Sequence, residues 1–393
     1  MKVLMTTDWY APAVNGVVAS VCTLAQALRA RGHEVRILTL SGTHHSHSEG
    51  DVFYAASLGV GRIYPGARLR LPDFRRSWRN FCGQRQGSGR AECWQPDIVH
   101  SQCEFSTFPL AKRIAAALDV PLVHTYHTMY EDYTHYLSLR KAWGARMVRR
   151  LTQRLSLSVS AIVVPSTKMS QRLVGFGVYC PLYVVPSGIN LAMFKAASGR
   201  ESVRQQYGVA PDDLLLLYVG RLAREKNVAE LVGLVAKTPG VHLLIVGDGP
   251  ARGDLEAQVR ALALTERVRF AGMVAPQTVA RYYQAGDLFV SASTSETQGL
   301  TYGEALASGL PLLCRADDCL RGVVTEGVNG WQYEDAAQFQ ARLRCWLRLD
   351  ETARASMKEA ACASAQMFSV AAFGEHMEQV YKEVLQDHER RRG

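Results

Sequence analysis

The residues best suited to chemistry lie in the second half of the chain, where Glu296 and Glu304 flank a predicted strand–loop–helix turn. The apolar run at 288–290 predicts a buried parallel strand, and residues 301–307 predict a helix that ends at a Gly-Leu-Pro sequence. This order puts the free N–H groups of the first helical turn at the carboxyl end of a sheet, where anions bind. Gly299, just before the helix, would let a ligand approach the backbone closely.

Together these groups suit a nucleotide-sugar. Its diphosphate would bind the N–H groups around Leu300 and Thr301. Glu304 would accept hydrogen bonds from the ribose hydroxyls, and Glu296 would reach the sugar. The alternative is an ordinary helix start in an α/β protein, with two surface glutamates beside it.

Two cations, Arg221 and Lys226, follow a strand predicted at 214–219. Fixed cations at a strand end would neutralise a diphosphate as it departs from the sugar. The chain contains no Asp-x-Asp sequence, so we expect no metal ion to be needed for this step. The alternative is a pair of surface cations beside a helix start.

The first half offers candidates at the ends of predicted strands. His127 follows one of them, although a histidine in this position is more often structural than catalytic. Asp8 and Tyr10 follow the first strand, in a loop that ends at Asn15 and Gly16, where a helix begins. An Asn-Gly pair alone is weak evidence for phosphate binding, because most such pairs only form turns.

Two of these elements share their sequence with a known family. Glu296 and Glu304 lie in a Glu-Thr-Gln-Gly-Leu-Thr-x-x-Glu-Ala sequence, which resembles the donor-site signature of the retaining GT-B glycosyltransferases of family 4. The Gly-Arg-Leu and Glu-Lys-Asn sequences around Arg221 and Lys226 are similar to a second element of that family. The resemblance covers essentially the whole chain. It implies the GT-B fold, with two Rossmann-like domains that face a cleft.

The family resemblance implies further roles. Gly16 would lie in the loop that approaches the donor phosphates, and Val274 would line the base pocket. His127 would hold the transferred sugar. Glu296 would support positive charge at the anomeric carbon, in a same-face reaction that retains configuration.

A narrower resemblance, carried by residues 124–136 and 8–17, is to bacterial diacylglycerol glucosyltransferases. It implies transfer of glucose from UDP-glucose to the sn-3 hydroxyl of 1,2-diacylglycerol, with no essential metal or cofactor. The acceptor site would consist of Asp8, Tyr10, Tyr130, Glu131, Tyr133 and His135. Another donor such as GDP-mannose, a phosphoinositide or soluble-sugar acceptor, and a non-catalytic nucleotide-sugar sensor remain as alternatives.

The length of the chain and its hydrophobic pattern predict the domains in which these sites lie. The 393 residues suggest two to three domains, and apolar runs that alternate with amphipathic segments predict α/β architecture with parallel sheets. We expect an N-terminal domain at 1–188, a linker at 189–200 and a nucleotide-sugar domain at 201–370. A last helix in 371–393 would pack back toward the N-terminal domain.

The net charge of +9 is unevenly distributed. Residues 1–190 contain 22 Lys and Arg against 11 Asp and Glu, whereas the rest of the chain contains 23 against 25. A basic half suggests an anionic partner, either nucleic acid or a membrane surface. No nucleic-acid-binding module is recognisable, and the basic segments at 62–90 and 138–156 mix arginines with apolar residues, which is typical of interfacial segments.

Compartment is predicted from what the sequence lacks. It shows no N-terminal signal peptide and no apolar stretch long enough to span a bilayer. The nine cysteines are an odd number and suggest reduced thiols. We therefore expect a cytoplasmic protein, bound peripherally to the inner face of the cell membrane. The His-rich loop at 44–47 has no assigned role.

Overall fold

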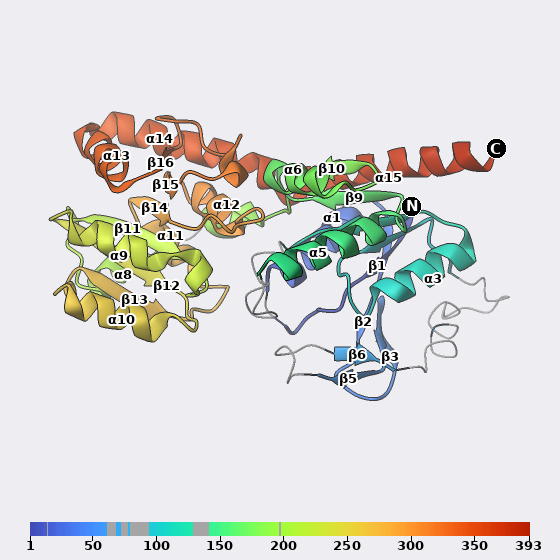
Figure 1. The fold of residues 1–393 in the computed structure, drawn as a ribbon. Helices are drawn as coiled ribbons and strands as arrows, with labels where there is room; N and C mark the ends of the chain where they lie inside the picture. The colour runs from blue at the N-terminus through green and yellow to red at the C-terminus, as the bar shows by residue number, and fades with distance from the viewer. Residues whose placement is uncertain (14, 61–67, 72–77, 79–93, 129–140, 196–197) are drawn as a thin grey trace. The chain divides into compact units, whose positions relative to one another are not determined.

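The structure is a computed structural model in which the chain divides into two compact units (Figure 1). One unit is Met1–Gly188 with Val370–Gly393, and the other is Ile189–Ser369. Each unit is α/β with a mainly parallel sheet, as predicted. The residues that the structure describes are 1–13, 15–60, 68–71, 78, 94–128, 141–195 and 198–393.

The sheet of the first unit has the strand order β10-β9-β8-β7-β1-β2-β4-β3. Every pair is parallel except β3 with β4. The order makes β1 and β7 neighbours, although 91 residues of chain separate the end of one from the start of the other. The strands are β1 (Lys2–Thr6), β2 (Glu34–Leu40), β3 (His47–Glu49), β4 (Val52–Ala55), β7 (Ile98–Ser101), β8 (Leu122–Thr125), β9 (Ala161–Val164) and β10 (Leu182–Val184), with β5 (Ser57–Gly59) and β6 (Arg68–Arg70) as a separate pair.

Helices cover both faces of this sheet. One apolar cluster joins the sheet to α1 (Gly16–Ala30) and α15 (Val370–Arg392). The other joins it to α3 (Phe108–Leu118), α5 (Lys141–Ser156) and α6 (Thr167–Phe176). The last helix of the chain therefore completes the core of the first unit. Among the described helices, none has the length and apolar composition needed to cross a membrane.

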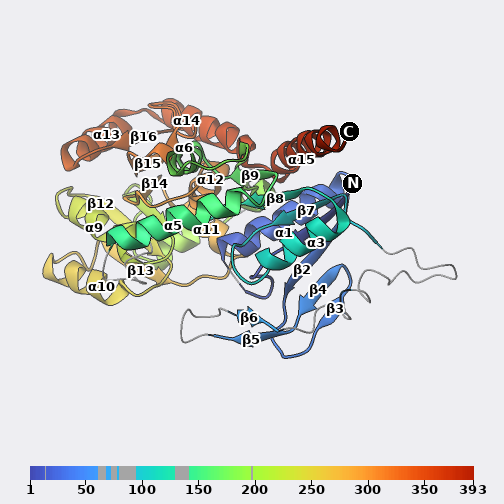
Figure 2. The same cartoon turned by 45° about the vertical axis from the view of Figure 1, so that its right-hand side comes forward.

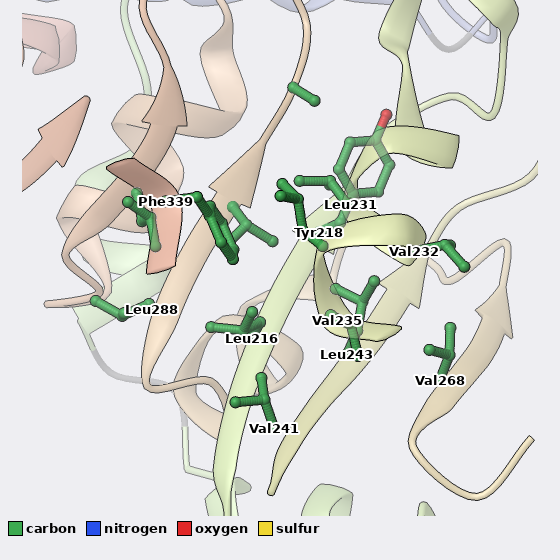
Figure 3. Close-up of a cluster of buried hydrophobic side chains, with 14 of the residues drawn as sticks. Leu216, Tyr218, Leu231, Val232, Val235, Val241, Leu243, Val268, Leu288 and Phe339 are labelled. Atoms are coloured by element: carbon green, nitrogen blue, oxygen red, sulfur yellow. The ribbon is translucent and has the colours of Figure 1, made fainter. Parts of the chain in front are cut away.

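The sheet of the second unit has the order β13-β12-β11-β14-β15-β16, and all its strands are parallel. Figure 3 shows one side of its core, where Leu216, Tyr218 and Leu243 of the sheet pack beside Leu231 and Val235 of helix α9 (Val228–Ala236). Continuous apolar strands such as Leu-Leu-Leu-Leu-Tyr-Val form because both faces are buried. The strands are β11 (Leu214–Val219), β12 (Val241–Val246), β13 (Val268–Gly272), β14 (Leu288–Ser291), β15 (Leu312–Arg315) and β16 (Gly330–Tyr333).

The helices of the second unit also form two layers, which Figure 2 shows from a second side. The first layer includes α9 (Val228–Ala236), α10 (Arg252–Ala261) and α13 (Ala336–Arg348). The second includes α7 (Leu191–Lys195), α8 (Arg200–Gln206), α11 (Val279–Ala285) and α12 (Leu300–Ala307). The remaining elements are α14 (Glu351–Ser364) and the 3-10 turns η2 (Arg224–Lys226), η3 (Asp318–Leu320) and η4 (Ala365–Phe368).

Two details differ from the sequence predictions, and two predicted segments cannot be compared. The segment expected as a linker at 189–200 contains α7, belongs to the second unit and buries Phe194, so only a short part of it can act as a connector. His47 begins strand β3 and stacks on Tyr54, so the His-rich segment is not entirely a loop. Most of the basic segment 62–90 and the run 129–140 lie outside the described residues.

Candidate functional site

The strand order of the second unit indicates where a ligand binds. β11 and β14 are neighbours, but the strands that follow them in the chain lie on opposite sides, so the loops after them diverge. Ligands of open α/β sheets bind at such a switch point, outside the carboxyl ends of the strands. The loop after β11 carries Arg221 and Lys226, and the loop after β14 carries Glu296 and Gly299. The structure therefore places four of the predicted donor-site residues on two neighbouring loops of the second unit.

The loop after β12 holds the loop after β11 through backbone contacts. The N–H of Gly220 donates to the carbonyl of Val246, and the N–H of Leu222 donates to the carbonyl of Asp248, both at 2.9 Å. A Cβ on Gly247 would lie 2.0 Å from the carbonyl oxygen of Gly220, so only glycine allows this approach. The two cations are thus carried by a loop with a fixed backbone.

Both cations are paired with carboxylates. Lys226 Nζ donates to Glu296 Oε1 at 2.6 Å, and these side chains are only 16% and 18% exposed. Arg221 donates through Nη2 to Glu225 Oε1. Ser295 Oγ donates to the carbonyl oxygen of Glu225 at 3.2 Å and ties the two loops together. A diphosphate at this place would compete with the carboxylates for donors that are already positioned.

The start of α12 suits an anion. Its N-cap residue, Gly299, has a φ of 72°, and a Cβ there would lie 2.4 Å from the ring of Tyr302. Glycine is therefore required by both conformation and space. Gly299 has no side chain to cap this helix, and the N–H groups at a helix start, here those of Leu300 and Thr301, are the donors that bind anions.

Glu304 lies one turn inside α12 and is half-buried. Its Oε2 accepts a hydrogen bond from the hydroxyl of Tyr283 at 2.7 Å. Tyr283 is on α11, is fully buried and packs against Phe194 and Phe289. Burial raises the pKa of Glu304 above its ordinary value, and the bond from Tyr283 opposes that rise. The hydrogen bond from Tyr283 thus fixes one carboxylate oxygen of Glu304 and orients the other. The contact of Glu304 with the ribose stays a prediction.

Val274 follows β13, the edge strand of the same sheet. Its side chain is partly buried against the cluster that contains α11 and α12. The preceding Met273 is 75% exposed. The predicted role of Val274 in binding the base is therefore placed at the carboxyl end of the sheet, but stays a prediction.

The switch point of the first unit lies between β1 and β7. Asp8 follows β1, and its carboxylate accepts the N–H groups of Ser106 at 3.0 Å and Thr107 at 2.7 Å, at the start of α3. Burial raises the pKa of Asp8. Asp8 thus joins the two loops at the switch point, a structural duty that the sequence did not predict beside its proposed acceptor role.

The loop after β1 ends in helix α1. Asn15 Oδ1 accepts the N–H of Val18 at 2.9 Å, which caps the helix and leaves Gly16 exposed in its first turn. Tyr10 is partly buried against the α1 and α15 cluster, and burial raises its pKa to about 12. The donor-phosphate role of Gly16 and the acceptor role of Tyr10 stay predictions.

His127 lies just after β8, the neighbour of β7, and is partly exposed. Its Nε2 is 2.8 Å from Oε1 of Gln102, which directly follows β7. Burial lowers the pKa of His127 to about 4, so its ring is neutral at neutral pH. The other predicted acceptor residues, Tyr130, Glu131, Tyr133 and His135, lie outside the described residues.

Three residues next to the site were missed by the sequence analysis. Glu225 holds Arg221, Tyr283 holds Glu304, and Gln102 contacts His127. Gln102 had a usable signal as a polar residue that directly follows a buried strand, and Glu225 lies in the Glu-Lys-Asn sequence that the family resemblance had already singled out. In the described part of the chain, no group of three or more His, Cys, Asp or Glu side chains is arranged to hold a metal ion.

Solved glycosyltransferases share this fold. The HepE protein of Anabaena, solved with UDP, matches with a TM-score of 0.74 over 98% of this chain and 100% of that one, at 19% identity. A sucrose-phosphate synthase from Thermosynechococcus elongatus matches with a TM-score of 0.75 over 98% and 99%, at 20% identity. The fold is therefore that of the GT-B glycosyltransferases.

Sequence comparison identifies the family. The model of Glycosyltransferase Family 4 matches residues 14–193, and that of glycosyl transferases group 1 matches residues 199–363. An alpha-monoglucosyldiacylglycerol synthase of Streptococcus pneumoniae is 35% identical over 85% of this chain and 75% of its own length. The enzyme of the same name from Acholeplasma laidlawii is 30% identical, with 84% of each chain covered. A GDP-mannose-dependent alpha-mannosyltransferase of Mycobacterium tuberculosis is 28% identical over 84% and 83%. The chain belongs to glycosyltransferase family 4 and is a hexosyltransferase.

Proposed function

We propose that this enzyme transfers glucose from UDP-glucose to the sn-3 hydroxyl of 1,2-diacylglycerol, with retention, to give alpha-monoglucosyldiacylglycerol. The observation that carries the proposal is the 35% identity to the Streptococcus pneumoniae synthase over 85% of this chain. The mannosyltransferase relative favours GDP-mannose as the second candidate donor.

The donor loops support a mechanism in which charge is neutralised by the protein. Arg221 and Lys226 leave their carboxylate partners and bind the diphosphate, which gains charge as the bond to the sugar breaks. Glu296, released from Lys226, accepts hydrogen bonds from sugar hydroxyls and stabilises positive charge at the anomeric carbon. A phosphate oxygen of the donor takes the proton of the attacking hydroxyl on the same face, so that configuration is retained.

The assay that tests the proposal uses the full chain, labelled UDP-glucose and diacylglycerol in mixed micelles. We expect a single glycolipid product with the mass of a monohexosyl-diacylglycerol and an α-linkage by NMR. UDP-galactose and GDP-mannose serve as competing donors. Faster turnover with GDP-mannose would reject UDP-glucose as the donor. Release of the sugar without labelling of the lipid would reject diacylglycerol as the acceptor.

We expect turnover to survive removal of divalent cations. Two side-chain cations lie at the donor switch point, so a metal ion is not required to neutralise the diphosphate. The measurement compares initial rates of UDP release before and after dialysis against EDTA. A complete loss that Mn²⁺ or Mg²⁺ restores would contradict the cation-pair mechanism.

Binding to an anionic membrane surface is the other expectation for a lipid acceptor. Helix α5 exposes Arg146 and Arg150. Each is followed by an exposed apolar residue: Met147 is 41% exposed and Leu151 is 56% exposed. Cations near an anionic bilayer contribute about 1 kcal/mol each, and apolar side chains enter the interface. We therefore propose that α5 contacts the membrane.

Replacing Arg146 and Arg150 with serine should weaken binding to phosphatidylglycerol vesicles about 30-fold, because two such contributions are lost. Vesicle sedimentation at low and high salt measures the effect. The matched control replaces Arg344 and Arg348, which are exposed at the same spacing on α13 of the other unit. Equal binding by both variants, or binding that salt does not weaken, would contradict docking through α5.

A further inference from the structure

A buried chain of hydrogen bonds reaches His127 from the far end of the sequence. Tyr381 on α15 lies with its hydroxyl 2.6 Å from Nδ1 of His100, on β7. The Nε2 of His100 lies 3.0 Å from the amide nitrogen of Gln102 and 2.7 Å from Oγ1 of Thr125. Gln102 Oε1 then meets Nε2 of His127 at 2.8 Å. All of these residues belong to the first unit.

The amide group of Gln102 sets the direction of these hydrogen bonds, and His100 follows it. Its side chain is fully buried, and burial lowers its pKa well below the ordinary value, so the ring is neutral and carries one proton. The amide N–H₂ of Gln102 can only donate, so Nε2 of His100 must accept. The proton of His100 is therefore on Nδ1, where it is donated to the hydroxyl of Tyr381.

The same reasoning fixes His127. The amide oxygen of Gln102 can only accept, so Nε2 of His127 must carry the proton. A neutral imidazole with its proton on Nε2 has a lone pair on Nδ1. Neighbouring His124 is not part of this chain, because its Nε2 faces Glu104 at 3.3 Å.

We propose that Gln102 is a positioning residue for the reaction, which holds His127 in the Nε2–H tautomer so that Nδ1 is presented as an uncharged acceptor to a sugar hydroxyl. The inference rests on the proposed function, in which His127 holds the transferred sugar. His100, which is itself bonded to Tyr381, accepts from the amide nitrogen of Gln102 and so holds the side chain of Gln102 beside His127. Helix α15, which completes the core of the first unit, thereby contributes to the positioning of His127.

The tautomer can be read without substrate. In the nitrogen-15 correlation spectrum of the full chain labelled at histidine, we expect one neutral imidazole in the Nε2–H form that disappears in His127→Ala. In Gln102→Leu this imidazole should become a mixture of tautomers. A wild-type His127 with its proton on Nδ1, or a signal that Gln102→Leu does not change, would overturn the inference. The wild-type spectrum is decisive even if Gln102→Leu fails to fold.

Turnover gives a second readout through a double-mutant cycle. Gln102→Leu should lower kcat of sugar transfer about tenfold, the effect of one lost hydrogen bond, with little change in KM for UDP-glucose. The double variant with His127→Ala should be no slower than His127→Ala alone, because Gln102 acts through His127. Additive losses would overturn the positioning role.

Trp94→Phe is the matched control. It removes a hydrogen bond from Nε1 of another buried side chain of the same unit, to Glu34 at 3.0 Å, and should leave turnover and the His127 signal unchanged. A failure of the proposed reaction can be told apart from a failure of this inference. If another nucleotide-sugar is the donor, the double-mutant cycle of Gln102 and His127 is measured with that donor. The histidine spectrum needs no substrate and does not depend on the donor.

Discussion

Replacing both Arg221 and Lys226 with alanine should lower kcat of UDP-glucose turnover about a thousandfold or more. Each cation is expected to contact the diphosphate, and removal of one preorganised donor from developing negative charge costs about 10²–10³ in rate. The loss should appear mainly in kcat, because the charge on the leaving group grows in the transition state. Single-turnover measurements with saturating donor separate this effect from binding.

The control variant must lose the same two positive charges as the Arg221 and Lys226 double variant. Alanine at Arg344 and Lys237 removes one arginine and one lysine from exposed positions of the same unit, outside the donor loops. The test variant also frees Glu225 and Glu296 from their partners, so a thermal melt is needed to show that both proteins are folded. Turnover of the test variant near that of the control would mean that the diphosphate binds elsewhere.

The donor loops were predictable because their chemistry is local. The spacing of Glu296 and Glu304 across a strand–loop–helix turn places them without knowledge of the rest of the chain. Gly299 was found for the same reason, because one backbone conformation demands it. What the sequence could not predict is the pairing of Lys226 with Glu296, since 70 residues separate them.

The supporting tyrosines, Tyr283 and Tyr381, depend on packing and could not be predicted from the sequence. Tyr283 is one of many aromatic residues, and only the approach of α11 to α12 gives it Glu304 as a partner. Tyr381 contacts His100 across 281 residues because α15 returns to the first unit. The predicted linker at 189–200 was too long for a related reason, since Phe194 has a buried place that only the folded unit provides.

Replacing Glu304 with alanine should weaken UDP-glucose binding about 10- to 150-fold. The expected loss is that of a charge-assisted hydrogen bond to the ribose, about 1.5–3 kcal/mol. Glu304→Gln keeps an acceptor oxygen but loses the charge, so its loss should be smaller. Titration calorimetry with UDP-glucose measures both variants, and kcat at saturating donor should change little.

The matched control for Glu304 is Glu359, an exposed carboxylate on α14 of the same unit. Glu359→Ala removes the same charge away from the switch point and should leave affinity unchanged. The affinity of Tyr283→Phe for UDP-glucose should lie between that of the wild type and that of Glu304→Ala, because this variant loses only the hydrogen bond that orients the carboxylate. Equal affinities for the wild type and Glu304→Ala would show that the ribose does not contact this residue.

The pH dependence of donor binding provides an independent check on Glu304. Burial raises its pKa, so the carboxylate takes up a proton at a higher pH than an exposed glutamate does. The ionised form accepts hydrogen bonds from the ribose, so affinity for UDP-glucose should fall as the pH is lowered through that raised pKa. The diphosphate of UDP-glucose stays ionised in this range, and Glu304→Gln should lose the dependence. A wild-type affinity that follows the same pH curve as Glu304→Gln would assign the titration to another group.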